Sequence, residues 1–211
     1  MWAKVCLVGP KGVGKSTMAS KFDKNAFSKL LKGTAISNFN MVIGNYKIDL
    51  QIWDTCGEDR FRCMGPIFYK AARAAMCMFD IASKQSFLDL QAWVVSVQQN
   101  ANDECIFVLL GNKKDLADDR AVTEKEALKY AESIGATYFE ICATTGEGVN
   151  EVFQHIATSL LHQNDCYNSY HAKLAITSSG IGFCGYTEGR KSKKKLKSDK
   201  IPSCFPCLLL G

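Results

Sequence analysis

A run of eight residues near the start of the chain, Gly9 to Ser16, limits its possible folds more than any other feature. It reads Gly-Pro-Lys-Gly-Val-Gly-Lys-Ser and fits the pattern G-x-x-x-x-G-K-[ST]. The apolar run Ala3 to Val8 before it predicts a buried strand, and Lys15 to Phe22 has the composition of a helix. A strand, a glycine loop and a helix in this order are the context in which the pattern binds phosphate. The alternative is a glycine-rich turn that fits the pattern by chance.

Loops of this kind hold anions with backbone N–H groups, and the following helix adds its positive end. Pro10 has no N–H, so the expected donors run from Gly12 to Ser16. We expect Lys15 to reach the β- and γ-phosphates of a nucleotide and the Ser16 hydroxyl to ligate Mg²⁺, the predicted cofactor. The other loop residues of the predicted nucleotide site are Gly9, Lys11, Val13, Gly14 and Thr17.

The chain up to Gln163 alternates predicted strands with predicted helices, which indicates an α/β fold with a mostly parallel sheet covered on both faces. One antiparallel hairpin is expected around Gly44-Asn45. Thr123 with Glu126 resembles a capping box, and Gly135 is placed to end that helix. The predicted strands after the first are 40–43, 47–53, 74–81, 106–110 and 138–142, and the clearest helical pattern covers 86–97.

Polar residues follow two of these strands. Asp54 closes the second hairpin strand and is the candidate partner of Mg²⁺ through a water molecule, while the Gly57 N–H is placed to approach the γ-phosphate. Asn112-Lys113-Lys114-Asp115 follows the strand 106–110. The Asp115 carboxylate is a double acceptor that matches the N1–H and amine donors of guanine, a pair that adenine lacks. A lone Asp after a strand is more often a turn former, and an isolated N-K-x-D match often occurs by chance. Both functional assignments therefore depend on the phosphate loop in the same chain.

These motifs resemble those of Ras-superfamily small GTPases, most of all the Rab branch, over roughly residues 1–161. The resemblance implies a three-layer P-loop NTPase fold with a six-stranded sheet and one antiparallel edge strand. It also implies a GTP hydrolase that switches between GTP and GDP in vesicle and membrane trafficking, with an exchange factor, a GTPase-activating protein and effectors as partners. Further segments that carry the resemblance are Leu50–Thr55, Arg60–Arg62, Phe68–Ala71, Asp80-Ile81, Ser86-Phe87 and Trp93.

Other site residues are implied by this resemblance alone. Thr34 falls at the position of the first-switch threonine, whose hydroxyl joins Mg²⁺ when the γ-phosphate is present. Phe27 matches the aromatic residue that packs against guanine. Cys142-Ala143-Thr144 occupies the family's S-A-K site, where the Ala143 N–H would contact guanine O6. The catalytic residues implied are Glu58, Gly57 and Lys15.

The second-switch segment departs from the family pattern W-D-T-A-G-Q, because Cys56 replaces Ala and Glu58 replaces Gln. An ionised Glu only accepts hydrogen bonds and brings negative charge toward the phosphates, so slow hydrolysis is expected. Alternatively, Glu58 acts as a base or points to solvent. Lys11 stands where the family carries Gly or a small residue, and it either pairs with Glu58 or extends into water. A rival function is a hydrolysis-poor, GTP-loaded scaffold.

The last part of the chain has a different composition. Residues 164–189 are rich in Ser, Gly, Tyr and Asn, and residues 190–200 are mostly Lys, so little fixed structure is expected after Gln163. We therefore expect a small GTPase domain at 1–163 and a flexible basic tail at 164–211. From Cys166 onward there are eight basic and two acidic residues, so the positive charge belongs to the tail and not to the domain.

The basic run Arg190 to Lys197 is expected to lie against an anionic membrane surface. Cys204 and Cys207 are candidate lipid acceptors, although a prenylation motif needs Cys at the position of Leu208. The alternatives are a solvated tail with free thiols and a nucleic-acid or nuclear-import element, and nucleic acid is the less expected partner. The chain shows neither a signal-peptide layout nor a long apolar stretch, which predicts a cytoplasmic protein, peripheral on the cytosolic face of an internal membrane.

Overall fold

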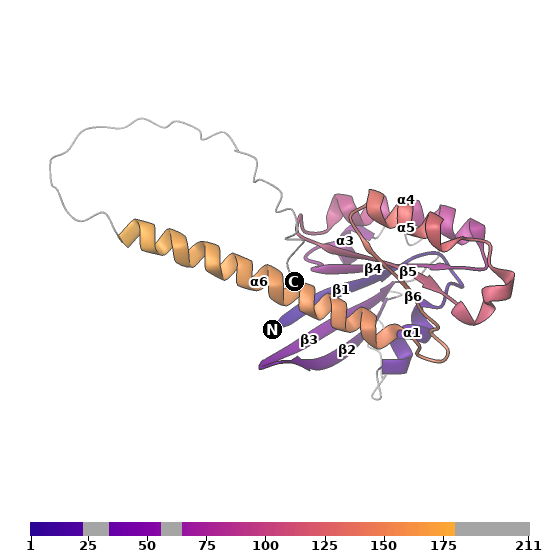
Figure 1. Ribbon diagram of the computed structural model, residues 1–211, viewed down its shortest axis with the longest axis horizontal. Coiled ribbons are helices and arrows are strands. Elements are labelled where there is room, and N and C mark those ends of the chain that lie inside the picture. Colours follow the sequence, from indigo (N-terminus) through magenta and orange to yellow (C-terminus); the bar gives the residue numbers. More distant parts are fainter. Residues whose placement is uncertain (23–33, 56–64, 180–211) are drawn as a thin grey trace, which may run out of the picture. The chain divides into compact units, whose positions relative to one another are not determined.

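The computed structural model of the protein describes residues 1–22, 34–55 and 65–179 (Figure 1). The chain divides into two compact units, Met1–His171 and Ala172–Gly211, and the described part of the second is the helical segment that ends at Ser179. The strands are β1 (Trp2–Val8), β2 (Thr34–Ile43), β3 (Tyr46–Thr55), β4 (Ala74–Asp80), β5 (Ile106–Asn112) and β6 (Thr137–Glu140). The helices are α1 (Lys15–Phe22), α3 (Gly65–Tyr69), α4 (Lys84–Asn100), the 3-10 helix η1 (Lys114–Asp119), α5 (Glu124–Ser133) and α6 (Val149–Ser179).

These strands form one six-stranded sheet in the order β2-β3-β1-β4-β5-β6. β2 pairs antiparallel with β3 around the Gly44-Asn45 turn, and each other neighbouring pair of the described strands is parallel. β4 is buried along its whole length, as expected for a strand in the middle of a covered sheet. The predicted P-loop α/β fold, mostly parallel with one antiparallel edge strand, is confirmed.

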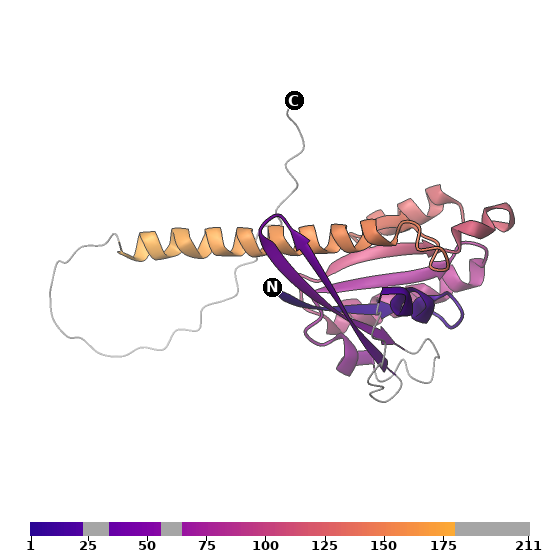
Figure 2. The ribbon, with the colours of Figure 1, turned by 90° about the horizontal axis from the view of Figure 1, so that it is seen from below.

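Helices cover both faces of the sheet (Figures 1 and 2). α1 and α6 pack on one face, where Met18 and Phe153 meet strand residues such as Leu7. α3, α4 and α5 pack on the other face, where Trp93 lies in the same cluster as Phe79. Burial of one such large side chain stabilises the fold by about 1.5–3 kcal/mol, so the two cores fix the sheet and the loops at its edge.

Two sequence-based boundaries are wrong. β2 begins at Thr34 and not near residue 40. Ser37 and the asparagines that follow are polar, so they mask the alternation of buried and exposed residues that would mark a strand. Ser37 is nevertheless buried. α6 continues to Ser179, whereas little fixed structure was expected after Gln163. Neither Gly nor Pro occurs between residues 149 and 179, so nothing in the sequence breaks the helix there. The capping box is confirmed, since the Glu126 N–H donates to the Thr123 hydroxyl.

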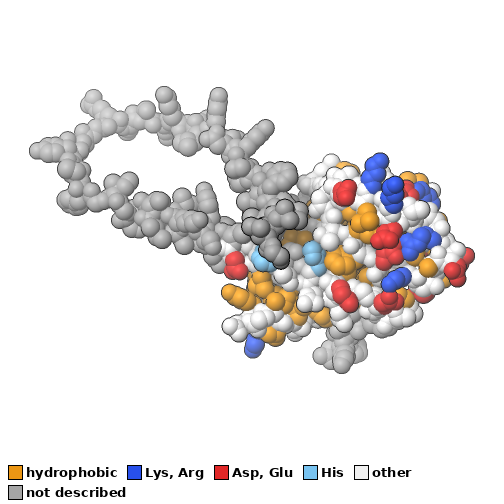
Figure 3. Space-filling view, in the orientation of Figure 1, with side chains coloured by type: hydrophobic (Ala, Val, Ile, Leu, Met, Phe, Trp, Pro, Cys, Tyr) orange, Lys and Arg blue, Asp and Glu red, His pale blue; other side chains and the backbone are white. Residues whose placement is uncertain are grey.

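The surface of the described part carries both signs of charge. In the view of Figure 3, acidic and basic side chains alternate over the right-hand part of the molecule. This agrees with the near balance of charge before the basic tail. None of the helices within the described residues is both long enough and apolar enough to span a bilayer.

Candidate functional site

The loops that follow the strands meet at the carboxyl edge of the sheet, where open α/β sheets bind their ligands. The predicted phosphate loop lies between β1 and α1. Asp54 lies near the end of β3, Asn112 ends β5, and the segment 141–147 follows β6. Residues far apart in sequence are thus brought to one edge.

Lys15 is the first residue of α1, and its side chain is buried. Its Nζ donates a hydrogen bond to the Pro10 carbonyl at 2.7 Å, so the loop folds around the ammonium group. The Met18 N–H donates to the Gly14 carbonyl at 3.0 Å, which closes the first turn of the helix. Positive charge therefore lies where a helix N-terminus also favours anions. Lys11, Gly12, Ser16 and Thr17 are exposed along the loop.

Gly14 has a backbone conformation that other residues rarely adopt, with φ at +100°. A Cβ at this position would stand 2.2 Å from the amide nitrogen of Asn112. The second glycine of the motif is therefore needed for a close approach between the phosphate loop and the end of β5.

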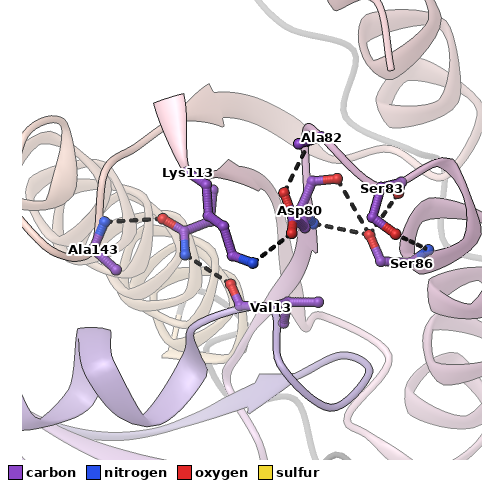
Figure 4. A network of polar contacts seen from close by, with 8 residues as sticks. Val13, Asp80, Ala82, Ser83, Ser86, Lys113 and Ala143 are labelled. Atoms are coloured by element: carbon purple, nitrogen blue, oxygen red, sulfur yellow. Dashed lines mark hydrogen bonds and ion pairs between the residues drawn. The ribbon is translucent and has the colours of Figure 1, made fainter. Parts of the chain in front are cut away.

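Asn112 joins the phosphate loop to the segment after β6. Its Nδ2 donates to the Val13 carbonyl at 2.7 Å, and its Oδ1 accepts from the Ala143 N–H at 2.9 Å. The side chain is buried, so both bonds are protected from water. Figure 4 shows that Val13 and Ala143 are both hydrogen-bonded to the same side chain. One amide thus holds two loops that are separated by well over one hundred residues.

The neighbouring Lys113 pairs with Asp80 at the end of β4 (Figure 4). Its Nζ lies 2.5 Å from Asp80 Oδ2, while Asp80 Oδ1 accepts from the Ala82 N–H at 2.9 Å. The Asp80 N–H in turn donates to the Ser86 hydroxyl at 3.0 Å. In the sequence, Asp80 and Ser86 stand out only through the family resemblance, and no local signal indicates that they hold Lys113.

Asp115 lies in the first turn of η1, and its carboxylate is exposed. Cys142 donates from its thiol to Asp115 Oδ1 at 3.1 Å. The Lys114 N–H donates to the Ile141 carbonyl at 3.2 Å, so the two loops also meet through their backbones. Both predicted base-contacting segments therefore lie side by side, with the Asp115 carboxylate facing solvent. Thr144 is exposed beside them.

Asp54 and Ser16 form the candidate metal site. Burial raises the pKa of the Asp54 carboxyl, while a hydrogen bond from Ser16 and the charge of Lys15 lower it. Within the described residues, Asp54 Oδ1 is buried without a hydrogen-bond partner, and an orphaned carboxylate oxygen beside a hydroxyl suits a hard cation. The described residues hold no group of three His, Cys, Asp or Glu that could bind a metal by itself. Mg²⁺ fits here if the phosphates supply further ligands.

A second hydrogen-bond network, which the sequence did not reveal, lies at the end of β6, next to the base-contacting segment 142–144. Arg120 donates two hydrogen bonds to Glu140, from Nη1 to Oε1 at 2.6 Å and from Nη2 to Oε2 at 2.9 Å. The Tyr138 hydroxyl donates to Glu140 Oε1 at 2.8 Å. The Arg120 hydrogen bond lowers the pKa of the Glu140 carboxyl from its ordinary value of 4.5. No local pattern signals a pair that is separated by 20 residues.

Replacing Glu140 with Gln is expected to lower the free energy of unfolding at neutral pH by about 1 kcal/mol, because a two-pronged charged pair is lost. The pKa of Glu140 is lower in the folded protein, so the pair stabilises the fold above pH 4.5. That contribution disappears as the pH falls through the folded-state pKa. Urea unfolding from about pH 6 down to about pH 3 should therefore show the gap between the two proteins closing.

The matched control is Glu147→Gln, which removes the exposed partner of Lys114. Little change is expected there, because both partners are exposed and solvent screens the pair. An equal loss in the two variants, or a gap that widens on acidification, would contradict the role assigned to Glu140.

Several predicted site residues lie outside the described residues. These are Phe27, Gly57 and Glu58, together with the candidate lipid acceptors Cys204 and Cys207. The backbone of Thr34 begins β2 opposite Thr55, and its side chain lies outside the description. The structure thus brings together the phosphate loop, Asp54, residues 112–115 and residues 142–144.

Comparison with known proteins agrees with this arrangement. The family model described as "Ras family" matches residues 4–162. Ras-related protein Rab-21 of Geodia cydonium is 35% identical over 165 residues, which cover 77% of this chain and 72% of the relative. Ras-related protein Rab-26 of Bos taurus is 40% identical over 164 residues, covering 74% and 63% respectively. Ras-related protein Rab-31 of Rattus norvegicus is 36% identical over 184 residues, covering 85% and 94%.

Proposed function

Because the chain belongs to the Ras family and is a Rab-like small GTPase, we propose that it cycles between Mg²⁺·GTP and GDP and regulates vesicle or membrane trafficking. The observation that carries this proposal is the double hydrogen bond of Asn112 to Val13 and Ala143. It couples a loop suited to polyphosphate with a loop suited to a base. A nucleoside di- or triphosphate is the ligand class that touches both.

Each residue has a defined task in this proposal. The N–H groups from Gly12 to Ser16 and the Lys15 ammonium bind the phosphates, and Asp115 selects guanine. The Ala143 N–H, which the resemblance assigns to guanine O6, instead donates to Asn112 Oδ1 in this structure. Phe27 and Thr144 flank the base. Ser16, Asp54 and Thr34 are the residues that would hold Mg²⁺, which supplies positive charge beside the β- and γ-phosphates.

The switch follows from contacts that exist only with GTP. In this proposal, the Thr34 hydroxyl and the Gly57 N–H are the groups that a γ-phosphate and its cation would hold. Loss of that phosphate releases both contacts, so the two nucleotides favour different arrangements of the segments around them. Exchange factors, GTPase-activating proteins and effectors are the partner classes that act on such a switch.

The experiment that tests this function is calorimetry on nucleotide-free protein with Mg²⁺ and either GDP or ADP. Guanine nucleotide should bind with large heat and raise the melting temperature, and ADP should do neither at the same concentration. If ADP bound as strongly as GDP, Asp115 would not select the base. Binding of neither would remove the proposed function altogether.

We propose that hydrolysis is slow because Glu58 cannot orient water as a glutamine amide does, and because Lys11 adds a long cation near the γ-phosphate. Glu58→Gln should raise the rate of phosphate release in a single turnover by about 10- to 100-fold. Asp59→Asn is the matched control, since it removes a neighbouring charge without supplying the amide. An unchanged rate in Glu58→Gln would refute the explanation, and a rate that stays negligible in both proteins would favour the GTP-loaded scaffold.

We propose that the basic tail places the protein on the cytosolic face of an internal membrane. Arg190 to Lys197 would contact anionic headgroups, and Cys204 and Cys207 would accept lipid. The division between the GTPase domain at 1–163 and the tail at 164–211 belongs to this proposal. Flotation with anionic and neutral vesicles, with and without residues 190–211, tests it against a solvated tail, and parallel nucleic-acid binding tests the remaining alternative.

A further inference from the structure

The β2-β3 hairpin reaches beyond the strand beside it. β1 begins at Trp2, which pairs with Asp49, whereas β3 begins three residues earlier, at Tyr46. At a rise of about 3.3 Å per residue, the end of the hairpin projects about 10 Å past the start of β1. Because β1 and β3 are parallel, this end lies at the edge of the sheet opposite to the phosphate loop.

Apolar side chains cover the end of the hairpin. Val42 is 67% exposed and Tyr46 is 51% exposed, while Met41 and Ile43 beside them are half-buried. We call these four residues the tip surface. Figure 3 shows hydrophobic side chains gathered over this hairpin, and Trp2 is exposed at the same edge of the sheet. A contiguous apolar surface that faces water is typical of an interaction site.

The charge of the hairpin indicates what kind of partner fits the tip surface. Residues 34–48 contain no Asp or Glu, and their one charged side chain is the exposed Lys47. Anionic lipid headgroups repel carboxylates and attract lysine. Tyr and Trp side chains favour the boundary between water and hydrocarbon, because they have an apolar ring and a polar atom. The hairpin therefore matches the headgroup region of an anionic bilayer in both charge and side-chain type.

α6 passes the same edge of the sheet. Gln163 in this helix accepts a hydrogen bond from Arg73 Nη2 at 3.2 Å and donates one to the Glu104 carbonyl at 2.9 Å. Arg73 directly precedes β4, and Glu104 lies just before β5, so both lie where parallel strands begin. The segment that follows Gln163 leads to the basic run 190–197. Stable attachment to a membrane takes two signals, and the tip surface supplies an apolar one at the edge from which the basic one departs.

We propose that the tip surface enters the headgroup region of an anionic lipid bilayer and, together with the basic tail, holds the domain with its nucleotide edge turned away from the membrane. This inference rests on the membrane attachment in the proposed function. The phosphate and base loops stay open to solvent in this orientation. The attraction between the basic tail and the lipid weakens as salt rises, whereas the apolar contribution of the tip surface does not.

The experiment measures binding of the full-length protein to vesicles of phosphatidylcholine and phosphatidylserine by cosedimentation. Val42→Ser and Tyr46→Ser should each weaken binding about three- to tenfold, since each removes an apolar side chain from the contact. The same factor should persist at high salt. Leu88→Ser and Val95→Ser are the matched controls, because these α4 side chains are 48% and 49% exposed on another element. They should bind vesicles as the wild-type protein does.

A fluorescent probe tests the contact itself. The emission of Tyr46→Trp should shift to shorter wavelength on these vesicles and be quenched by brominated lipid, whereas Leu88→Trp should show neither effect. Wild-type binding that the hairpin variants do not weaken, or a Tyr46→Trp probe that stays unquenched on bound protein, would overturn the tip contact and leave the tail proposal standing. No vesicle binding by the wild-type protein would overturn both. Self-association without lipid that Tyr46→Ser abolishes would assign the tip surface to a second copy of the chain and overturn the inference.

Discussion

Asp115→Asn is expected to lower the affinity for GDP by at least about 100-fold and to create affinity for xanthosine diphosphate. The carboxylate accepts two hydrogen bonds, whereas an asparagine amide accepts one and donates one. An amide nitrogen would face the exocyclic amine of guanine, donor against donor. Xanthine carries a carbonyl at that position, and it matches the amide. Asp115 is exposed, so the substitution should leave the fold intact.

Titration of nucleotide-free protein with GDP and xanthosine diphosphate measures both effects. Asp118→Asn is the matched control, since Asp118 is also an exposed carboxylate of η1. It should bind GDP as the wild-type protein does. Undiminished GDP binding by Asp115→Asn would show that another group selects the base, and weak binding of both nucleotides would show that the loop had been damaged.

The fold was largely predictable because its signals are local. The glycine loop marks the junction of β1 and α1, and the Gly44-Asn45 turn marks the hairpin. Thr123 and Glu126 mark the start of α5, since a cap depends on residues only three apart. β2 shows the limit of such signals. Its first half is polar, and its pairing with β3 outweighs the weak strand propensity of Ser37 and Asn38.

The site was predictable in its members but not in their connections. Spacing and residue type pointed to Asp115 and Asn112 individually. The bonds from Asn112 to Val13 and Ala143 depend on how β1, β5 and β6 are arranged in the sheet, which no local pattern encodes. Asp80 was likewise named only as part of the family resemblance, and its pairing with Lys113 requires β4 and β5 to be neighbours.

Gly14→Ala tests the close approach on which the whole site depends. We expect the free energy of unfolding to fall by about 3–5 kcal/mol and GDP affinity to fall at least about 100-fold. A left-handed backbone costs an alanine about 1–2 kcal/mol. The remainder arises because the new Cβ would displace the Asn112 amide, 2.2 Å away, and leave the buried Val13 carbonyl unpaired. Thermal and urea unfolding measure the first effect, and calorimetry measures the second.

Alanine variants of two other glycines separate the effect of backbone strain from the effect of losing the Asn112 hydrogen bonds to Val13 and Ala143. Gly12 and Gly44 also have positive φ, at +84° and +56°, but no atom lies within 4 Å of a Cβ built on either. Gly12→Ala should therefore lose only about 1–2 kcal/mol of unfolding free energy. Gly44→Ala should lose a similar amount and keep its GDP affinity, because it lies in the β2-β3 turn. If Gly14→Ala lost no more stability than these two, Asn112 would have room to move aside, and the phosphate and base loops would not be coupled through it.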